Sequence, residues 1–392
     1  MSQQLINRSP DLKRLRDEGY DVEVRSNYLL IKHVPYVNAK KEIDFAILVS
    51  ELSMAGDVTT RPSTHVASFT GDHPCNNDGS EIVKIKYQSE DKTLDRDLVI
   101  HHSFSSKPPD GYIDYYHKMT TYVAIISSPA QSIDPNVTAR TFPVIESDID
   151  ESPFNYIDTA SSRAQINVVT RKLEIGRVGI VGLGGTGSYV LDLVAKTSVK
   201  EIVLFDGDKF LQHNAFRSPG APSVEVLRQA SKKAIYFKDL YSKMHRNIVA
   251  NDYIDASNVH QLQGMDFVFL CLDRAEARTL IVETLEHLDI PFIDVGMGVE
   301  LVDEMLHGVL RITTSTAKKR EHVRGKNRIP LSEGGGNNDY SRNIQIAELN
   351  ALNAALAVIK WKKLFGYYSD LEKENFSTYT IDGNSLINED QL

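Results

Sequence analysis

The stretch VGIVGLGGTG, residues 178–187, decides the fold of this chain. Its first four residues are typical of a short buried strand, and Val190, Leu191 and Val194 recur at helical spacing directly after it. Glycines at a strand–helix junction allow a tight turn and a close approach of the backbone to phosphates, while the first N–H groups of the helix attract an anion. The stretch therefore predicts a strand, a nucleotide-binding turn and a helix; the alternative is the same turn without a ligand.

Strands and helices continue to alternate beyond this unit. Further apolar runs predict strands at residues 202–205, 267–272 and 291–295. Such alternation is typical of an α/β fold with a doubly wound, mainly parallel sheet. A late helix that ends at Gly366 is expected to bury a stripe made of Leu349, Leu352, Leu356 and Ile359.

The first 150 residues follow a different pattern, without a glycine-rich loop. Short apolar runs predict the strands of a small sheet at residues 28–34, 45–49, 82–87 and 98–100. A helix is predicted over residues 112–127, ended by Pro129. We expect a smaller α+β domain over residues 1–150 and, after an acidic linker, an α/β domain over residues 151–392. Within the second domain, the basic and glycine-rich residues 311–342 are expected to form a mobile crossover loop.

Composition places the chain among ordinary globular proteins. Its 392 residues are 41% hydrophobic and 25% charged, and 44 Lys and Arg against 53 Asp and Glu give a formal net charge of −9. The acidic balance argues against nucleic-acid binding through the whole surface, and no apolar run has the length of a transmembrane helix or the character of a signal peptide. We therefore expect a cytoplasmic protein with no nucleic-acid or membrane partner. The two cysteines, Cys75 and Cys271, exclude a disulfide framework and a zinc site built from CxxC pairs.

The class of nucleotide is not decided by the glycine loop alone. Asp206 ends the second predicted strand, where a carboxylate can accept hydrogen bonds from ribose hydroxyls. With only these features, a nicotinamide-dependent oxidoreductase and an ATP-dependent enzyme are equally well supported.

The residues after Asp206 favour ATP. Acidic, amide and basic side chains follow closely in the sequence. They are Asp208, Asn214, Arg217, Lys232 and Lys233. Cations and amides next to a phosphate stabilise the charge that grows on a pyrophosphate leaving group. Asp273, at the tip of the third strand, supplies the carboxylate that Mg²⁺ prefers.

In this order, the motifs resemble the ThiF/MoeB/HesA family, the ancestral form of ubiquitin-activating enzymes. The order is GLGGTG, then Asp206-x-Asp208, then Asn214-x-x-Arg217, then a helical lysine, then Asp273 with Arg278 beyond it. The resemblance covers about residues 155–385 and implies a Rossmann-like adenylation domain that works as a homodimer. It further implies that ATP and Mg²⁺ are used to adenylate the C-terminal tail of a ubiquitin-like protein. The alternatives are activation of a sulfur carrier for cofactor biosynthesis, an NAD-binding Rossmann oxidoreductase and an inactive scaffold.

The resemblance also implies a role for each matching residue. The expected catalytic residues are Arg217, Lys233, Asp273 and Arg163, with Asp273 as the metal ligand. The expected nucleotide-binding residues are Gly182, Gly184, Gly185, Gly187, Asp206, Asp208, Asn214 and Lys232, of which Lys232 is the alternative register for the lysine. Arg163, in Ser161-Ser162-Arg163-Ala-Gln165, is expected to reach the γ-phosphate of ATP bound by the partner subunit. Relative to the family pattern, one residue is inserted between Arg163 and Gln165. The alternative for Arg163 and for Arg217 is a role in surface ion pairs.

The sequence departs from the family in its cysteines. It lacks the two CxxC pairs with which many relatives hold zinc, so no zinc is expected. Residues 300–345 lack the cysteine that would take the acyl group as a thioester. Three routes remain: direct transfer to a thiol or sulfide on another protein, transfer to a hydroxyl of the crossover with His322 as the nearby base, or adenylation alone. The candidate hydroxyls are those of Thr313, Thr314, Ser315, Ser332 and Ser341.

Neither remaining cysteine is expected to take the acyl group. Cys271 lies inside an apolar run and is expected to be a small buried hydrophobe, and Cys75 is expected in a loop. The crossover is instead rich in cations, at Lys318, Lys319, Arg320, Arg324, Lys326 and Arg328. These either clamp an extended peptide or an acidic partner, or are simply solvated.

The polar and aromatic residues 101–118 leave the role of the N-terminal domain open. One interpretation is a recognition surface for a ubiquitin-like protein or a conjugating enzyme, anchored by tyrosines such as Tyr112 and Tyr115. A second is metal binding by His101 and His102, although adjacent strand residues face opposite sides. A third is a half-buried domain with a hydrated aromatic face. The domain resembles those that precede ThiF-type modules in bacterial ubiquitin-like operons, some of them associated with phage defence.

Overall fold

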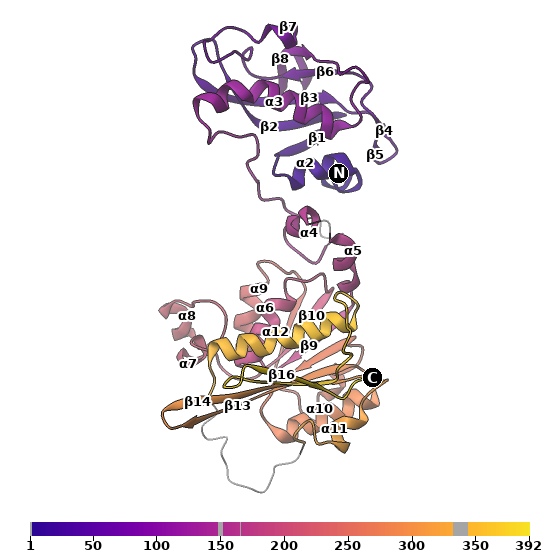
Figure 1. Ribbon diagram of the computed structural model, residues 1–392, viewed down its shortest axis with the longest axis vertical. Helices are drawn as coiled ribbons and strands as arrows, with labels where there is room; N and C mark the ends of the chain where they lie inside the picture. Colours follow the sequence, from indigo (N-terminus) through magenta and orange to yellow (C-terminus); the bar gives the residue numbers. More distant parts are fainter. Residues whose placement is uncertain (1, 148–151, 165, 332–343) are drawn as a thin grey trace. The chain divides into compact units, whose positions relative to one another are not determined.

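The computed structural model describes residues 2–147, 152–164, 166–331 and 344–392, and its chain divides into two compact units (Figure 1). The first unit comprises Met1–Asp148 with Asp158–Gln165, and the second comprises Ile149–Ile157 with Ile166–Leu392. Among the described residues, every helix is too short or too polar to cross a bilayer.

The first unit is an antiparallel sheet with one long helix packed on it. The strand order is β1-β2-β3-β6-β8-β7. The strands are β1 (Val22–Arg25), β2 (Tyr28–Val37), β3 (Ile43–Glu51), β6 (Val66–Phe69), β7 (Lys86–Asp95) and β8 (Leu98–Ser105), with a separate hairpin of β4 (Met54–Ala55) and β5 (Val58–Thr59). The helices are α1 (Ser2–Arg8), α2 (Pro10–Asp17), α3 (Tyr115–Ile133) and α4 (Thr159–Arg163), with a 3₁₀ turn η1 (Val83–Ile85).

The predicted bounds of one strand and of the long helix are wrong in this unit; the helix begins at Tyr115 rather than at residue 112. The strand expected at residues 82–87 begins only at Lys86 and runs to Asp95, because β7 is a polar edge strand without the apolar alternation that marks a half-buried one. The helix expected to end before Pro129 continues to Ile133 with this proline inside it. Ala130 is fully buried one residue later, so the packed face of α3 extends past the proline.

The tyrosines expected to anchor a recognition surface belong to the core. Tyr112 and Tyr115 are buried, and the hydroxyl of Tyr115 accepts a hydrogen bond from Ser53 N at 2.6 Å. Lys118 is also fully buried, and its Nζ donates to Ser50 Oγ at 2.8 Å and to two backbone carbonyls. The predicted surface at these positions is therefore wrong: the helical period turns Tyr115 and Lys118 toward the sheet, and Tyr112 is buried just before the helix.

The second unit is an eight-stranded mixed sheet, and it confirms the predicted α/β class. The order is β11-β10-β9-β12-β13-β14-β15-β16, with parallel pairing from β11 to β13 and antiparallel pairing from β13 to β16. The strands are β9 (Arg177–Val181), β10 (Glu201–Phe205), β11 (Ile248–Asn251), β12 (Phe267–Leu270), β13 (Phe292–Val302), β14 (Met305–Ser315), β15 (Phe376–Thr380) and β16 (Ser385–Glu389). The helices are α5 (Asn167–Thr170), α6 (Gly185–Val194), α7 (Gln212–Ala215), α8 (Val224–Gln229), α9 (Lys233–Tyr241), α10 (Ala275–His287), α11 (Glu321–Gly325) and α12 (Ala347–Leu364), with 3₁₀ turns η2 (Arg171–Leu173) and η3 (Val259–Leu262).

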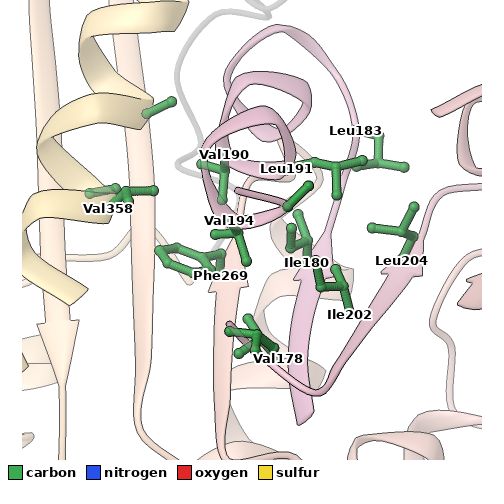
Figure 2. Close-up of a cluster of buried hydrophobic side chains, with 14 of the residues drawn as sticks. Val178, Ile180, Leu183, Val190, Leu191, Val194, Ile202, Leu204, Phe269 and Val358 are labelled. Atoms are coloured by element: carbon green, nitrogen blue, oxygen red, sulfur yellow. The ribbon is translucent and has the colours of Figure 1, made fainter. Parts of the chain in front are cut away.

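Both faces of the parallel strands are buried. Along β9 and β10, Ile180 and Ile202 pack into the cluster beneath α6 and α12 (Figure 2), while Val181 and Val203 pack into a second cluster beneath α10. Alternate residues of a strand point to opposite faces, so a strand covered on both sides must be apolar throughout. This explains why these strands are continuous apolar runs in the sequence.

The predicted stripe on α12 has the wrong phase. Ile359 is 42% exposed, whereas small and polar residues face inward. The inward-facing residues are Leu349, Asn350, Asn353, Ala354, Ala357, Val358 and Trp361. Small residues are needed there because α12 approaches α6 closely: a Cβ added at Gly185 would lie 2.0 Å from Asn350 Nδ2.

The segment 311–342, expected to be one loop, is partly regular structure. Residues 311–315 continue β14, whose Val309–Thr313 pair with Thr380–Phe376 of β15, and α11 follows at Glu321–Gly325. The expectation is wrong for these residues because β14 lies between β13, its hairpin partner, and β15, which is more than sixty positions away in the sequence. Residues 332–343 lie outside the described residues.

Candidate functional site

The glycine-rich turn is built so tightly that two of its glycines cannot carry a side chain. Gly182 has φ +87°, and a Cβ there would lie 2.6 Å from the carbonyl oxygen of Cys271. A Cβ on Gly187 would lie 1.9 Å from the carbonyl oxygen of Gly182. Gly184, the N-cap of α6, is different because nothing lies within 4 Å of its Cβ position. The turn therefore has open space above it, where an anion can approach the first N–H groups of α6.

Asp206 secures this turn from the end of β10. It is buried, and its carboxylate accepts hydrogen bonds from Leu183 N at 2.7 Å and from Asp208 N at 2.9 Å. Burial raises the pKa of Asp206, and the charge of Lys233 opposes this rise. The predicted ribose ligand thus also holds the glycine turn in place.

Asp208 lies at the centre of a small charged cluster. Its Oδ2 accepts a hydrogen bond from Lys233 Nζ at 2.8 Å, and its Oδ1 accepts one from the hydroxyl of Tyr253. Burial acts to raise the pKa of Asp208, but the Lys233 and Tyr253 hydrogen bonds outweigh it and lower the pKa. Arg274 lies 5.2 Å from the centre of the Tyr253 ring. Tyr253 was missed in the sequence; its one signal is an aromatic side chain just beyond a strand end.

The structure separates the two candidate lysines. Lys233 begins α9, is buried, and lies 3.9 Å from Asp206 Oδ2 in addition to its bond with Asp208. Lys232 is exposed and forms an ion pair with Asp252. Lys233 is therefore the lysine that faces the predicted nucleotide site.

Asn214 and Arg217 come from α7 and the residues just after it. Asn214 is buried, and its Oδ1 accepts a hydrogen bond from Leu211 N at 2.8 Å. The Nε of Arg217 is buried and finds no acceptor among the described residues. A buried guanidinium N–H without an acceptor is costly, and a phosphate oxygen would satisfy it.

A second residue missed in the sequence, Asn350, joins this segment to the glycine turn. Its Oδ1 accepts a hydrogen bond from Thr186 Oγ1 at 2.9 Å, and its Nδ2 donates to the carbonyl of Arg217 at 3.4 Å. Gly185, expected to contact the nucleotide, packs closely against this asparagine, and its contact with a nucleotide stays a prediction. The sequence did not point to Asn350, because hydrophobic spacing marks only the apolar residues of α12.

The other two expected catalytic residues are less enclosed. Asp273 is exposed in the loop between β12 and α10, at the carboxyl end of the parallel strands. Arg163 is an exposed residue of the first unit, on α4, where its guanidinium lies 5.3 Å from the Phe142 ring. Arg163 is thus not among the residues that the second unit brings together.

The alternative acyl acceptors are withdrawn from solvent. Thr313, Thr314 and Ser315 are buried in β14, and Thr313 Oγ1 donates to the carbonyl of Arg328 at 3.1 Å. His322, the proposed base, is buried too, and burial lowers its pKa. The hydroxyl route is therefore wrong for these three residues, while Ser332 and Ser341 lie outside the described residues.

Among the described residues, the two cysteines and the histidine pair His101 and His102 have no features of a nucleophile or a metal site. Burial raises the pKa of both thiols, with further contributions from nearby carboxylates, so neither is poised as a nucleophile. His101 pairs with Asp91 and His102 with Ser89, each through Nδ1. Within the described ranges, no group of three or more His, Cys, Asp or Glu side chains could hold a metal ion.

Most cations of the basic segment are paired with acids, and four of them with acids from elsewhere in the chain. Five of its six cations have a carboxylate partner: Lys319 pairs with Glu321, Arg320 with Asp289, Arg324 with Glu286, Lys326 with Asp390, and Arg328 with Asp390 and Glu389. These five cations are thus already paired within the chain, which favours the alternative in which they do not clamp an acidic partner. The acids lie in or just after α10 and β16, apart from Glu321.

Replacing Asp390 with asparagine is expected to destabilise the second unit in a pH-dependent way. Burial acts to raise the pKa of Asp390, but the hydrogen bonds from Lys326 and Arg328 outweigh it and hold the pKa below its ordinary value of 3.8. The carboxylate thus binds a proton more weakly in the folded chain than in the unfolded one. Its contribution is complete above about pH 4 and is lost as the pH falls through the folded pKa.

Urea unfolding at several pH values tests this prediction. We expect Asp390→Asn to lower the free energy of unfolding by about 2 kcal/mol at pH 7, a typical value for hydrogen bonds to a charged group. The difference from the unsubstituted chain should shrink below pH 4. A difference that does not change with pH would contradict the assignment.

Comparisons with known proteins match each part of the chain separately. Residues 160–301 match the ThiF family, and residues 10–159 match a domain of unknown function, DUF6791. Ubiquitin-like modifier-activating enzyme 5 of Drosophila virilis is 25% identical over 162 residues, which cover 38% of this chain and 40% of that protein. The Caenorhabditis elegans protein of that name is 26% identical over 144 residues, 34% of each chain. The chain therefore spans only about a third to two fifths of the length of these curated relatives. A crystal structure of E. coli MccB with MccA-N7isoASN is 19% identical and covers 60% of this chain and 73% of that chain, with a TM-score of 0.47.

Proposed function

Residues 160–301 of this chain are a ThiF-family domain, as the sequence predicted, and on this premise we propose that the protein adenylates the C-terminal carboxylate of a ubiquitin-like protein. The proposed substrate is ATP with Mg²⁺, the proposed products are an acyl adenylate and pyrophosphate, and the proposed working form is a homodimer. A bacterial conjugation pathway, with a role in phage defence, is the proposed setting.

The observation that carries the proposal is the buried Nε–H of Arg217, which has no acceptor in the part of the chain that the structure describes. Asn350 links the backbone of Arg217 to Thr186 on α6, so the two elements are held together. A buried Nε–H that finds no acceptor among the described residues is suited to a phosphate oxygen, and the turn at Gly184 leaves open space for one. Lys233 adds a second cation at the same end of the sheet.

The residues present also suit Mg²⁺. This ion usually takes one or two protein carboxylates and completes its shell with water and phosphate oxygens, so the exposed carboxylate of Asp273 is sufficient. When bound there, Mg²⁺ would neutralise charge on the phosphate oxygens.

In the proposed reaction, a carboxylate oxygen of the ubiquitin-like protein attacks the α-phosphorus of ATP. The bond from that phosphorus to the oxygen bridging the α- and β-phosphates breaks, and pyrophosphate leaves with the negative charge. Arg217 and Lys233 hold positive charge where this leaving group develops, which lowers the barrier without any proton transfer. Asp206 orients the ribose while it keeps the glycine turn in shape.

Isotopic exchange between pyrophosphate and ATP tests the proposal. The full chain is incubated with ubiquitin-like proteins encoded near its gene, and each is compared with the same protein lacking its last residue. We expect exchange only with one intact carrier, because the truncated carrier ends one residue short and its new carboxylate no longer reaches the α-phosphate. Absence of exchange with every carrier, together with saturable binding of NAD(H) in a fluorescence titration, would contradict the proposal and favour an oxidoreductase.

A further inference from the structure

We infer that Arg278 is a positioning residue that couples the loop carrying Asp273 to residues 328–331. The coupling itself follows from contacts in the second unit. Its consequence for Mg²⁺ rests on the proposed function.

The centre of the arrangement is a buried carboxylate between two guanidinium groups. Asp294, on β13, is 0% exposed. Its Oδ1 lies 3.1 Å from Nε of Arg278, on α10, and its Oδ2 accepts a hydrogen bond from Arg311, on β14. A buried carboxylate is stable only with such partners, so both arginines are held in place by it.

The remaining N–H groups of the two arginines bind backbone carbonyls of different segments. Arg278 donates through Nη2 to the carbonyl of Leu272, the residue before Asp273, and through Nη1 to the carbonyl of Pro330 at 3.5 Å. Arg311 donates to the carbonyl of Arg328. Only Arg278 therefore touches both the Asp273 loop and residues 328–331.

A third side chain strengthens this connection. Thr279, next to Arg278 on α10, donates through Oγ1 to the carbonyl of Leu331. Residues 328–331 are thus tied to α10 and to the sheet through the carbonyls of Arg328, Pro330 and Leu331. Any displacement of these residues is transmitted through Arg278 to the backbone beside Asp273.

This matters because the Asp273 side chain is exposed and depends on its backbone for position. Groups that orient a metal ligand, without touching the metal, typically contribute 10- to 100-fold to metal affinity or activity. Arg278 has the geometry for that role toward Asp273.

The test compares Arg278→Lys with Arg311→Lys. Each variant keeps a cation beside Asp294, so this buried carboxylate remains paired in both. A lysine has a single Nζ and cannot hold Asp294, Leu272 and Pro330 together, whereas Arg311→Lys leaves the bond to Leu272 untouched. Urea unfolding of both variants corrects for any general loss of stability.

The first readout is limited trypsin digestion of the protein without ligands, which needs no enzymatic activity. We expect Arg278→Lys to speed cleavage after the exposed Arg274 by about tenfold, the effect of one lost charged hydrogen bond on local opening. Arg311→Lys should cleave there at the unsubstituted rate. Equal rates in all three chains, or equal acceleration in both variants, would overturn the coupling.

The second readout is the Mg²⁺ concentration that gives half-maximal ATP–pyrophosphate exchange. It should rise about tenfold in Arg278→Lys and stay unchanged in Arg311→Lys. An unchanged value in Arg278→Lys would overturn the positioning role. If the unsubstituted chain shows no exchange at any Mg²⁺ concentration, the proposed function fails, while the digestion still decides the coupling.

Discussion

Replacing Asp273 with alanine is expected to lower ATP–pyrophosphate exchange by about 10³-fold or more, the upper range for loss of one charged group in an active site. The carboxylate is the proposed magnesium ligand, and without it the charge of the phosphates is not compensated at the carboxyl end of β12. The fold should remain intact, because exposed residues outside special contacts change stability by less than about 0.5 kcal/mol.

Glu276→Ala is the matched control for this variant. Glu276 lies three residues farther along, exposed in the first turn of α10, and its removal changes the net charge equally. Exchange should stay close to that of the unsubstituted chain. If Asp273→Ala retains exchange within a few-fold of Glu276→Ala, the assignment of Asp273 is wrong.

Gly187→Ala is expected to destabilise the second unit by at least about 3 kcal/mol, at or beyond the usual cost of overpacking. The added methyl would lie 1.9 Å from the carbonyl oxygen of Gly182 and 3.0 Å from Cβ of Cys271. Neither neighbour can move away easily, because Gly182 is itself held at φ +87° and bonded through its N–H to Phe205.

Fluorescence of the single tryptophan measures the loss of stability of the second unit. Trp361 is fully buried in the cluster beneath α12, so urea unfolding followed at this residue reports on the second unit. Gly184→Ala is the control, since nothing lies within 4 Å of its Cβ and its φ is −68°. A loss of stability as large in Gly184→Ala as in Gly187→Ala would contradict the steric explanation.

Much of the second unit was predictable because its signals are local. The strands at 178–181 and 202–205 appeared as apolar runs, since both faces of the parallel sheet are covered. The first unit was less predictable. Its edge strand β7 is polar on both faces, and helix α3 continues through a proline that usually marks an end.

The candidate site was predictable only in its residue types. Asp206, Asp208 and Lys233 were expected near a nucleotide, and the structure brings Nζ of Lys233 within 4 Å of both carboxylates. The contacts of individual residues could not be predicted. Lys232 forms an ion pair with Asp252, and Gly185 packs against Asn350 of α12. Asn350 and Tyr253 were missed because each enters the site from a distant or irregular segment.

The sequence by itself determined the strand–turn–helix unit around Gly182–Gly187, since a turn in which a Cβ would meet backbone admits only glycine. It likewise determined the α/β class through the apolar strands. The tertiary structure alone decided which charges meet. Arg278 donates to the carbonyl of Pro330, 52 residues away in the sequence, and Arg328 donates to Asp390, 62 residues away. Cations that the local sequence leaves without acids are therefore paired with acids from distant segments. The physical reason is that backbone conformation is set by neighbours in sequence, whereas a buried or paired charge is set by neighbours in space.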